Sequence, residues 1–307
     1  MSPKFSKNNS NSYLAQIFIK MSKKIKKSAS TLKIPKLILI TAQFLSVIST
    51  NLTVLFAAKL FTTPIKHKIP KRELEMDAQS EQQLVLIPSI KKEIMVYQYG
   101  ESKKKILLVH GWSGRGTQMV RIADELIANG FSTVSFDAPG HGKSPGKTTI
   151  MLEFIATILE LEKQFGPFEA AVGHSLGGMS LLNAVRQGLK INHLITIGSA
   201  DVVKDIVDHF ISKLELKPEM GDKLQLHFEK KYGEKMDSLS AYISAKEIEI
   251  PVLIIHDNDD EEVPIKCAIH IHKHLKNRQL MITKGLGHRR ILGDQNVVEK
   301  LVHFIQN

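Results

Sequence analysis

The chain has 307 residues, 43% of them hydrophobic and 24% charged, which excludes a wholly disordered chain, a collagen-like chain and a multi-span membrane protein. Its single cysteine, Cys267, excludes an intramolecular disulfide and a cysteine-based metal cluster. The net charge of +11 comes from one end, because residues 1–72 hold 13 lysines, one arginine and no acidic residue, whereas residues 73–307 hold 28 basic and 31 acidic residues. That distribution argues against a nucleic-acid-binding domain, which needs a basic patch on its folded surface.

Residues 1–36 form a basic arm rich in Lys, Ser and Asn. Such a composition cannot bury enough apolar surface to order itself, so we expect the arm to be disordered. Met21 is followed by Ser22 and two lysines, as a gene start would be, and the sequence leaves open whether Met1 or Met21 is the true start.

An apolar helix is predicted over residues 37–60. The run from Leu37 to Ala58 contains no charge and is long enough to cross a hydrocarbon core. Nine lysines precede it, as the positive-inside rule would place them on the cytoplasmic side. A stripe of polar residues instead favours an amphipathic helix that lies on the protein body or on a bilayer surface. This stripe consists of Gln43, Ser46, Thr50 and Thr53.

Both readings of residues 37–58 stay open, and a cleaved signal peptide is disfavoured by the length of the run. The protein is accordingly expected in the cytoplasm or attached to the cytoplasmic membrane through this segment, with membrane-surface contact as one of its interactions. We expect a chain that starts near Glu73 to keep any catalytic activity and to lose any membrane association.

The rest of the chain alternates strands and helices. Such alternation predicts an α/β fold with a mostly parallel central sheet flanked by helices. The predicted core covers residues 83–200 and 250–307, and residues 201–249 are a charged helical insertion expected to form a small cap. The expected strands are 83–87, 93–99, 105–110, 131–136, 168–172, 193–197, 251–256 and 279–282, and the expected helices are 117–129, 150–165, 176–187 and 296–304.

The segment Gly173-His174-Ser175-Leu176-Gly177-Gly178 lies directly between a predicted strand and a predicted helix. Its glycines permit a sharp turn that lifts a serine hydroxyl clear of the sheet edge, at the N-terminus of the helix. Ser175 is therefore the candidate nucleophile. A serine hydroxyl is weak without a base, and in this arrangement an acid and then a histidine follow along the chain.

His288 lies in a glycine-flanked loop after the last predicted strand, where ligands bind in parallel sheets, and is the candidate base. The orienting acid should follow the strand that ends at His256, because it must accept from the second ring nitrogen of the base. From the residues alone, five carboxylates compete for that role: Asp257, Asp259, Asp260, Glu261 and Glu262.

The oxyanion of an acyl-transfer reaction needs backbone N–H donors. One should be the N–H of Leu176, just after the nucleophile, and the other should come from the loop that follows an early strand. That loop is His110-Gly111-Trp112-Ser113-Gly114, and the N–H of Trp112 is the predicted second donor.

Other chemistries find no support in the sequence. It contains no dinucleotide-binding or phosphate-loop glycine pattern and no metal-ligand spacing, so no cofactor and no metal are expected. The loop Asp137–Ser144 is read as a shaping loop, without a catalytic role for Asp137 or His141. His270, His272 and His274 cannot all share one helix face and are expected at the surface.

Together these motifs resemble those of the α/β-hydrolase superfamily, over about residues 83–307. The resemblance implies the α/β-hydrolase fold and a serine, histidine and acid triad. It also implies that the acid is Asp260, four residues after His256, although Asp257 stands where a glycine is usual. The matching segments are His110–Trp112, Asp137–Gly142, Gly173–Gly178, His256–Pro264 and Gly287–His288.

Within the superfamily the chain resembles a bacterial group of esterase-like hydrolases. The group carries His-Gly-Trp-x-Gly-Arg-Gly-x-Gln, here residues 110–118, and Gly-Leu-Gly-His-Arg-Arg, here residues 285–290. It also has a helix that ends in Phe-x-x-Pro ahead of the body, here residues 61–64, which implies that this helix packs on the body.

These features predict a serine hydrolase that acts on a small-molecule carboxylic ester through a Ser175, His288 and Asp260 triad and an acyl-enzyme. Thioester cleavage, peptide cleavage and acyl transfer remain alternatives on the same fold. So does a ligand receptor or lipid-binding module that keeps a silent triad, because fold does not fix function.

Overall fold

A computed structural model describes residues 34–307. The expected disorder of residues 1–36 and the choice between Met1 and Met21 therefore fall almost entirely outside the described residues. Residues 36–307 form one compact unit.

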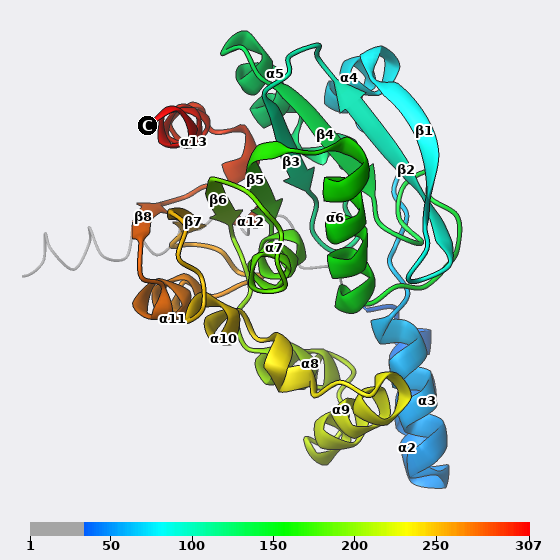
Figure 1. Cartoon of the computed structure of the whole chain (residues 1–307). Coiled ribbons are helices and arrows are strands. Elements are labelled where there is room, and N and C mark those ends of the chain that lie inside the picture. Colours follow the sequence, from blue (N-terminus) through cyan, green and yellow to red (C-terminus); the bar gives the residue numbers. More distant parts are fainter. Residues whose placement is uncertain (1–33) are drawn as a thin grey trace, which may run out of the picture. The chain divides into compact units, whose positions relative to one another are not determined.

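The centre of this unit is an eight-stranded sheet in the order β1-β2-β4-β3-β5-β6-β7-β8. The β1–β2 and β2–β4 pairs are antiparallel and the other pairs are parallel, which confirms the predicted mostly parallel sheet. Figure 1 shows the strands side by side, with helices on both faces of the sheet. The strands are β1 (Glu81–Ile87), β2 (Lys92–Tyr99), β3 (Lys105–Val109), β4 (Ser132–Asp137), β5 (Phe168–His174), β6 (His193–Ile197), β7 (Val252–Asp257) and β8 (Arg278–Thr283).

The central strands are short apolar runs because both faces of the sheet are buried. Successive side chains point to opposite faces, so Ile106 and Leu108 of β3 join the core under α5 (Val120–Ala128) and α13 (Gln295–Gln306). Leu107 and Val109 point to the other face, where α6 (Met151–Phe165) and α7 (Leu176–Arg186) pack. The core thus fixes the carboxyl ends of the parallel strands at one edge.

The helical insertion between β6 and β7 contains α8 (Val203–Lys213), α9 (Glu219–Tyr232) and α10 (Ala241–Ala245), with a 3-10 turn at Met236–Leu239. Pro218 lies just ahead of α9, where its missing N–H costs nothing. α10 packs on α7, and Figure 1 shows α8 and α9 extending beyond the carboxyl ends of the strands. Three further helices of the body are α4 (Leu74–Gln79), α11 (Lys266–His274) and α12 (Gly287–Arg290).

The helix predicted over residues 37–60 is divided into two, α2 (Lys36–Ile48) and α3 (Thr50–Phe61). Ser49 adopts an extended backbone between them, with φ −158° and ψ 123°, and its hydroxyl accepts from the N–H of Leu52 at the start of α3. This N-cap satisfies a donor that a helix start leaves free. In the part of the chain that the structure describes, no helix has both the length and the apolar character to cross a membrane.

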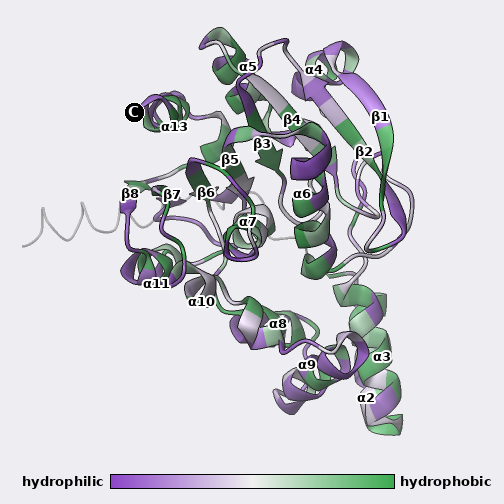
Figure 2. Ribbon diagram, in the orientation of Figure 1, coloured by the Kyte–Doolittle hydropathy of each residue, from purple (hydrophilic) through white to green (hydrophobic). Residues whose placement is uncertain are grey.

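α2 packs on α3, and α3 packs on α9 of the insertion. The side-chain amide of Gln43 donates to Glu215 at 2.8 Å. The ring of Phe61 lies 5.1 Å from that of Phe210 and 5.7 Å from that of Phe228, measured between centroids. Figure 2 shows that hydrophobic residues predominate along both helices.

The segment that follows α3 contacts the body directly. The N–H of Ile65 donates to the hydroxyl of Ser113 at 3.0 Å, and the ammonium of Lys66 donates to the carbonyl of Ser144 at 2.9 Å. The N–H of Thr149 donates to the carbonyl of Thr62 at 2.9 Å. Ser113 belongs to the predicted oxyanion loop, so a chain that starts near Glu73 would lose one hydrogen bond to that loop, and its retained activity stays a prediction.

Candidate active site

Ser175 connects β5 directly to α7 in a strained turn. Its backbone has φ 54° and ψ −119°, although positive φ costs a non-glycine residue on the order of 1–3 kcal/mol. Such strain persists only where the surroundings hold it, and here the N–H of Ser175 donates to the carbonyl of Ile197 at 2.9 Å. The side chain is partly exposed, and its hydroxyl makes no hydrogen bond within residues 34–307.

The glycines on both sides of Ser175 are required by close packing. A Cβ on Gly173 would lie 2.6 Å from the backbone of Gly177, and a Cβ on Gly177 would lie 2.2 Å from the carbonyl oxygen of Val109. Both distances are shorter than any van der Waals contact. The G-x-S-x-G pattern therefore allows β5, α7 and β3 to meet at this point.

The predicted oxyanion loop approaches Ser175. A Cβ on Gly111 would lie 2.8 Å from the Cβ of Ser175, so the loop and the serine are nearly in contact. Among the described residues, no acceptor takes a hydrogen bond from the backbone N–H of Trp112 or of Leu176. Both predicted donors are thus unengaged, and the Trp112 side chain packs edge-on against His141, with centroids 5.4 Å apart.

His288 and Asp260 form a buried pair. Nδ1 of His288 lies 2.7 Å from Oδ2 of Asp260, and only 6% and 1% of the two side chains are exposed. The other oxygen of Asp260 accepts from the N–H groups of Glu262 and Val263, each at 2.9 Å. Burial alone would raise the pKa of Asp260, but the hydrogen bonds from His288 and these two N–H groups lower it below its usual value. Asp260 is therefore a stable anion beside the imidazole.

The structure separates Asp260 from its neighbours Asp257 and Asp259. Asp259 is exposed, whereas Asp257 is buried at the end of β7. Asp257 accepts from the hydroxyl of Thr283 at 2.7 Å and from the N–H groups of Leu286 and Gly287 at 3.1 and 2.9 Å. It thus ties the loop that carries His288 to the sheet.

His174, which precedes Ser175, also supports the loop of His288. Nε2 of His174 lies 2.9 Å from the carbonyl oxygen of His288, and since a carbonyl only accepts, Nε2 carries the proton. Burial lowers the pKa of His174 to about 3, so the ring stays neutral at neutral pH. The sequence around His174 does not indicate this contact, because it joins residues that are 114 positions apart.

Two further buried histidines hold the predicted oxyanion loop, a part that the sequence does not indicate for either of them. Nε2 of His141 accepts from the N–H of Ser113 at 3.1 Å, and Nε2 of His110 accepts from the N–H of Ala138 at 3.0 Å. Burial lowers the pKa of His110 to about 4 and that of His141 to about 3. An imidazolium could not accept these bonds, so the loop geometry depends on both rings being neutral.

These histidines predict a loss of stability in mild acid. An unfolded histidine binds a proton near pH 6.5, whereas His110, His141 and His174 stay neutral in the fold down to about pH 4 or 3. The unfolded state therefore binds more protons in this window, and each histidine lowers the free energy of unfolding by about 1.4 kcal/mol per pH unit as the pH falls from roughly 6.5 to 4. Urea unfolding at about pH 7.5 and about pH 5 measures this difference.

The matched variants for this pH experiment are His141→Gln and His67→Gln. Removing His141 should reduce the pH slope of the unfolding free energy by one proton, whereas replacing His67, which is exposed, should leave the slope unchanged. Equal stability of the wild-type protein at the two pH values would contradict the neutral-histidine assignment.

The loop Asp137–Ser144 is held by Asp137, as its reading as a shaping loop implies. Asp137 accepts from the hydroxyl of Tyr97 at 2.8 Å and from the N–H groups of Gly116 and Lys143 at 2.7 and 2.6 Å. His270 and His274 are less exposed than expected: their rings pack edge-on against each other and tilted against Tyr242, and Nδ1 of His270 contacts Asp201. They lie one helical turn apart, which places these two on one face while His272 points elsewhere.

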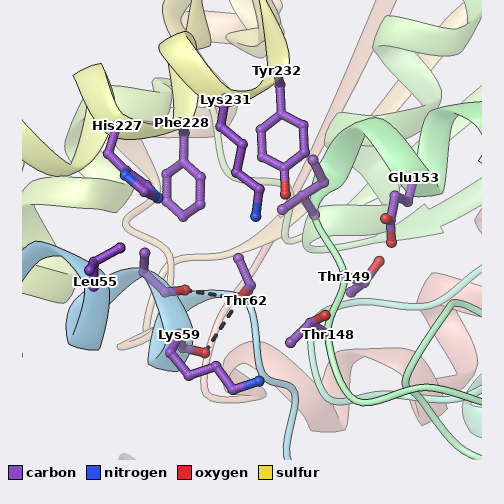
Figure 3. A pocket seen from close by; sticks show the side chains of 12 residues that line it. Leu55, Lys59, Thr62, Thr148, Thr149, Glu153, His227, Phe228, Lys231 and Tyr232 are labelled. Atoms are coloured by element: carbon purple, nitrogen blue, oxygen red, sulfur yellow. Dashed lines mark hydrogen bonds between the residues drawn. The ribbon is translucent and has the colours of Figure 1, made fainter.

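A cavity of about 370 Å³ lies between α3, α6 and α9 (Figure 3). Its wall is mixed: Phe228 and Leu55 are apolar, Lys59 and Lys231 are basic, and Glu153 is paired with Lys92. None of Ser175, Asp260 and His288 lines it.

Within residues 34–307 no group of three or more His, Cys, Asp or Glu side chains is arranged to hold a metal ion.

A mostly parallel sheet with a strained serine at the start of α7, and a histidine–aspartate pair in the loops after β7 and β8, defines an enzyme-like site at the carboxyl edge of an α/β protein. Residues 106–299, more than half of the chain, match the family model described as "Alpha/beta hydrolase family". The chain belongs to the alpha/beta hydrolase family.

Solved structures agree with this family at the level of the fold. An esterase from Exiguobacterium antarcticum is 20% identical with a TM-score of 0.59, covering 74% of this chain and 100% of its own. The alpha/beta hydrolase domain-containing protein 10 from mouse is 18% identical with a TM-score of 0.59, over 74% and 97%. A monoacylglycerol lipase from Paleococcus ferrophilus is 22% identical with a TM-score of 0.56, over 69% and 98%. A search of curated proteins gave no match to the chain.

Proposed function

We propose that the protein is a serine hydrolase that cleaves carboxylic esters, with Ser175 as nucleophile, His288 as base and Asp260 as the orienting acid. The observation that carries the proposal is the 2.7 Å contact between His288 and Asp260, in a fold where a partly exposed serine occupies the turn after β5. The names of two similar structures, an esterase and a monoacylglycerol lipase, support an acyl ester as the substrate class.

The proposed reaction follows from the hydrogen bonds of the pair. Because Asp260 accepts from Nδ1 of His288, the free basic nitrogen is Nε2, which takes the proton of Ser175 as the serine oxygen attacks the acyl carbon. The N–H groups of Leu176 and Trp112 would receive the negative charge that develops on the carbonyl oxygen. His288 then protonates the leaving alcohol. In the second step it takes a proton from the attacking water and returns it to the Ser175 oxygen as the acid is released.

A fluorophosphonate probe tests whether the serine is activated. Such a probe reacts with the nucleophile of a working triad, so we expect one adduct per chain on the peptide that contains Ser175, found by mass spectrometry. Rates with p-nitrophenyl esters of graded acyl length then define the substrate. A chain that binds acyl ligands but forms no adduct would instead be a ligand-binding homologue with a silent triad.

A further inference from the structure

α2 exposes an apolar stripe on the side that faces away from the protein. The stripe consists of Leu37, Ile40, Phe44, Val47 and Ile48, whose side chains are between 57% and 87% exposed. Their spacing of three, four, three and one residues places them within about a third of the helix circumference at 100° per residue. A contiguous exposed apolar surface of this kind marks an interaction site rather than a solvated face.

Two polar residues of the same segment contact the protein, whereas Ser46 and Thr50 are exposed. Gln43 bonds to Glu215 of the insertion, and Thr53 is buried, where its hydroxyl donates to the carbonyl of Ser49 at 2.8 Å. Exposed apolar side chains continue in α3, where Leu52 and Leu55 are about half exposed.

Exposed lysines flank the α2–α3 pair along the chain, and the acidic residue that contacts α2 is Glu215 of the insertion, bonded to Gln43. Lys36 begins α2, Lys59 lies near the end of α3, and Lys68 follows, all of them exposed. Residues 1–72 hold 14 basic residues and no acidic one. A second copy of the chain would bring an equally basic surface to the stripe, whereas anionic lipid headgroups attract each nearby lysine or arginine.

We propose that the α2–α3 pair lies on the surface of an anionic lipid bilayer, with the apolar stripe inserted at the boundary of headgroups and acyl chains. Helices of 13 and 12 residues are too short to span the hydrocarbon core but long enough to lie in its interface. The extended backbone at Ser49 lets both helices contact the insertion while α2 keeps the stripe outward. Hydrophobic burial and lysine attraction then add to the binding.

Sedimentation of the full-length chain with lipid vesicles tests the proposal. We expect binding to vesicles of phosphatidylcholine and phosphatidylglycerol in a 3:1 ratio, weaker binding to phosphatidylcholine alone, and a decrease at high salt because screening weakens the lysine contribution. The triple variant Ile40→Ser, Phe44→Ser and Val47→Ser should lower the partition coefficient by at least about tenfold, since each large side chain contributes on the order of tenfold when fully buried.

The matched control is Leu86→Ser, Ile269→Ser and Ile282→Ser, three equally apolar positions away from α2 that are between 51% and 54% exposed. It should bind vesicles as the wild-type chain does. Val47→Asp, at the most exposed position of the stripe, is a single change that leaves the packed face untouched, and it should also weaken binding to anionic vesicles.

Three outcomes would overturn the proposal. The first is a wild-type chain that does not bind anionic vesicles; if it is then a dimer that the triple variant converts to a monomer, the stripe is an interface between copies. The second is equal binding to neutral and anionic vesicles, which removes the lipid charge from the argument. The third is a control that loses binding as the triple variant does. None of these readouts uses ester hydrolysis, so the membrane proposal and the proposed function can fail separately.

Discussion

Replacing Ser175 by alanine is expected to abolish hydrolysis of short p-nitrophenyl esters while the protein stays folded. The side chain is partly exposed and its hydroxyl makes no hydrogen bond among the described residues, so its loss removes no native contact. Alanine tolerates the positive φ of 54° no worse than serine, so the turn should survive. Loss of a nucleophile costs several powers of ten in rate, which an ester assay together with a thermal unfolding curve would measure.

The matched control for this experiment is Ser180→Ala. Ser180 lies on the same helix, α7, and its hydroxyl donates to the carbonyl of Leu176 at 2.8 Å. Its replacement removes a local hydrogen bond without touching the turn, so activity should remain within about tenfold of the wild-type rate. More than a few per cent of the wild-type rate in Ser175→Ala would refute the serine mechanism.

The sheet could be predicted well because its signals are local. The central strands are short apolar runs separated by helices, and burial on both faces requires such runs. The observed strand His193–Ile197 has the predicted bounds, and the others differ by one or two residues at their ends. The turn at Ser175 was also recognisable, since glycines 173 and 177 are required by contacts within the motif and with β3.

The helix break at Ser49 could not be predicted with the same ease. Val47 and Ile48 before it are apolar, Thr50 and Asn51 after it are polar, and no glycine or proline marks the position. Ser49 is a favoured N-cap, but a serine also occurs inside helices, and the cost of breaking one is offset here by packing on the insertion. The polar stripe is only partly exposed, because Thr53 is buried whereas Ser46 and Thr50 face water.

The supporting histidines were hidden because their partners are distant in the sequence. His141 accepts from Ser113, 28 positions away, and His174 donates to the carbonyl of His288. A sequence pattern shows that such residues lie in loops at the same sheet edge, but not which ring nitrogen meets which backbone group. The part of Asp257 in holding the loop of His288 was missed for the same reason, since its partners follow the next strand.

The comparison of three aspartates tests the remaining assignment. Asp260→Asn should reduce kcat by roughly 10³–10⁴, because an amide at this position favours the wrong histidine tautomer and cannot stabilise the imidazolium. Asp259→Asn is the matched control, one residue away and exposed, and should cost less than about tenfold. If Asp260→Asn impairs the reaction and not the stability of the fold, the two variants should have nearly the same unfolding temperature.

Asp257→Asn has a different expected signature, and this difference separates support of the loop from orientation of the base. Each oxygen of Asp257 accepts two hydrogen bonds, including those from Leu286 and Gly287, so an amide nitrogen at either position leaves donors without an acceptor. Hydrogen bonds to a charged group contribute about 1.5–3 kcal/mol each, so this variant should lose stability first and activity through the displaced loop. Asp260→Asn should lose kcat without a comparable loss of stability. A large fall in kcat for Asp257→Asn or Asp259→Asn, with Asp260→Asn near the wild-type rate, would show that another carboxylate orients His288.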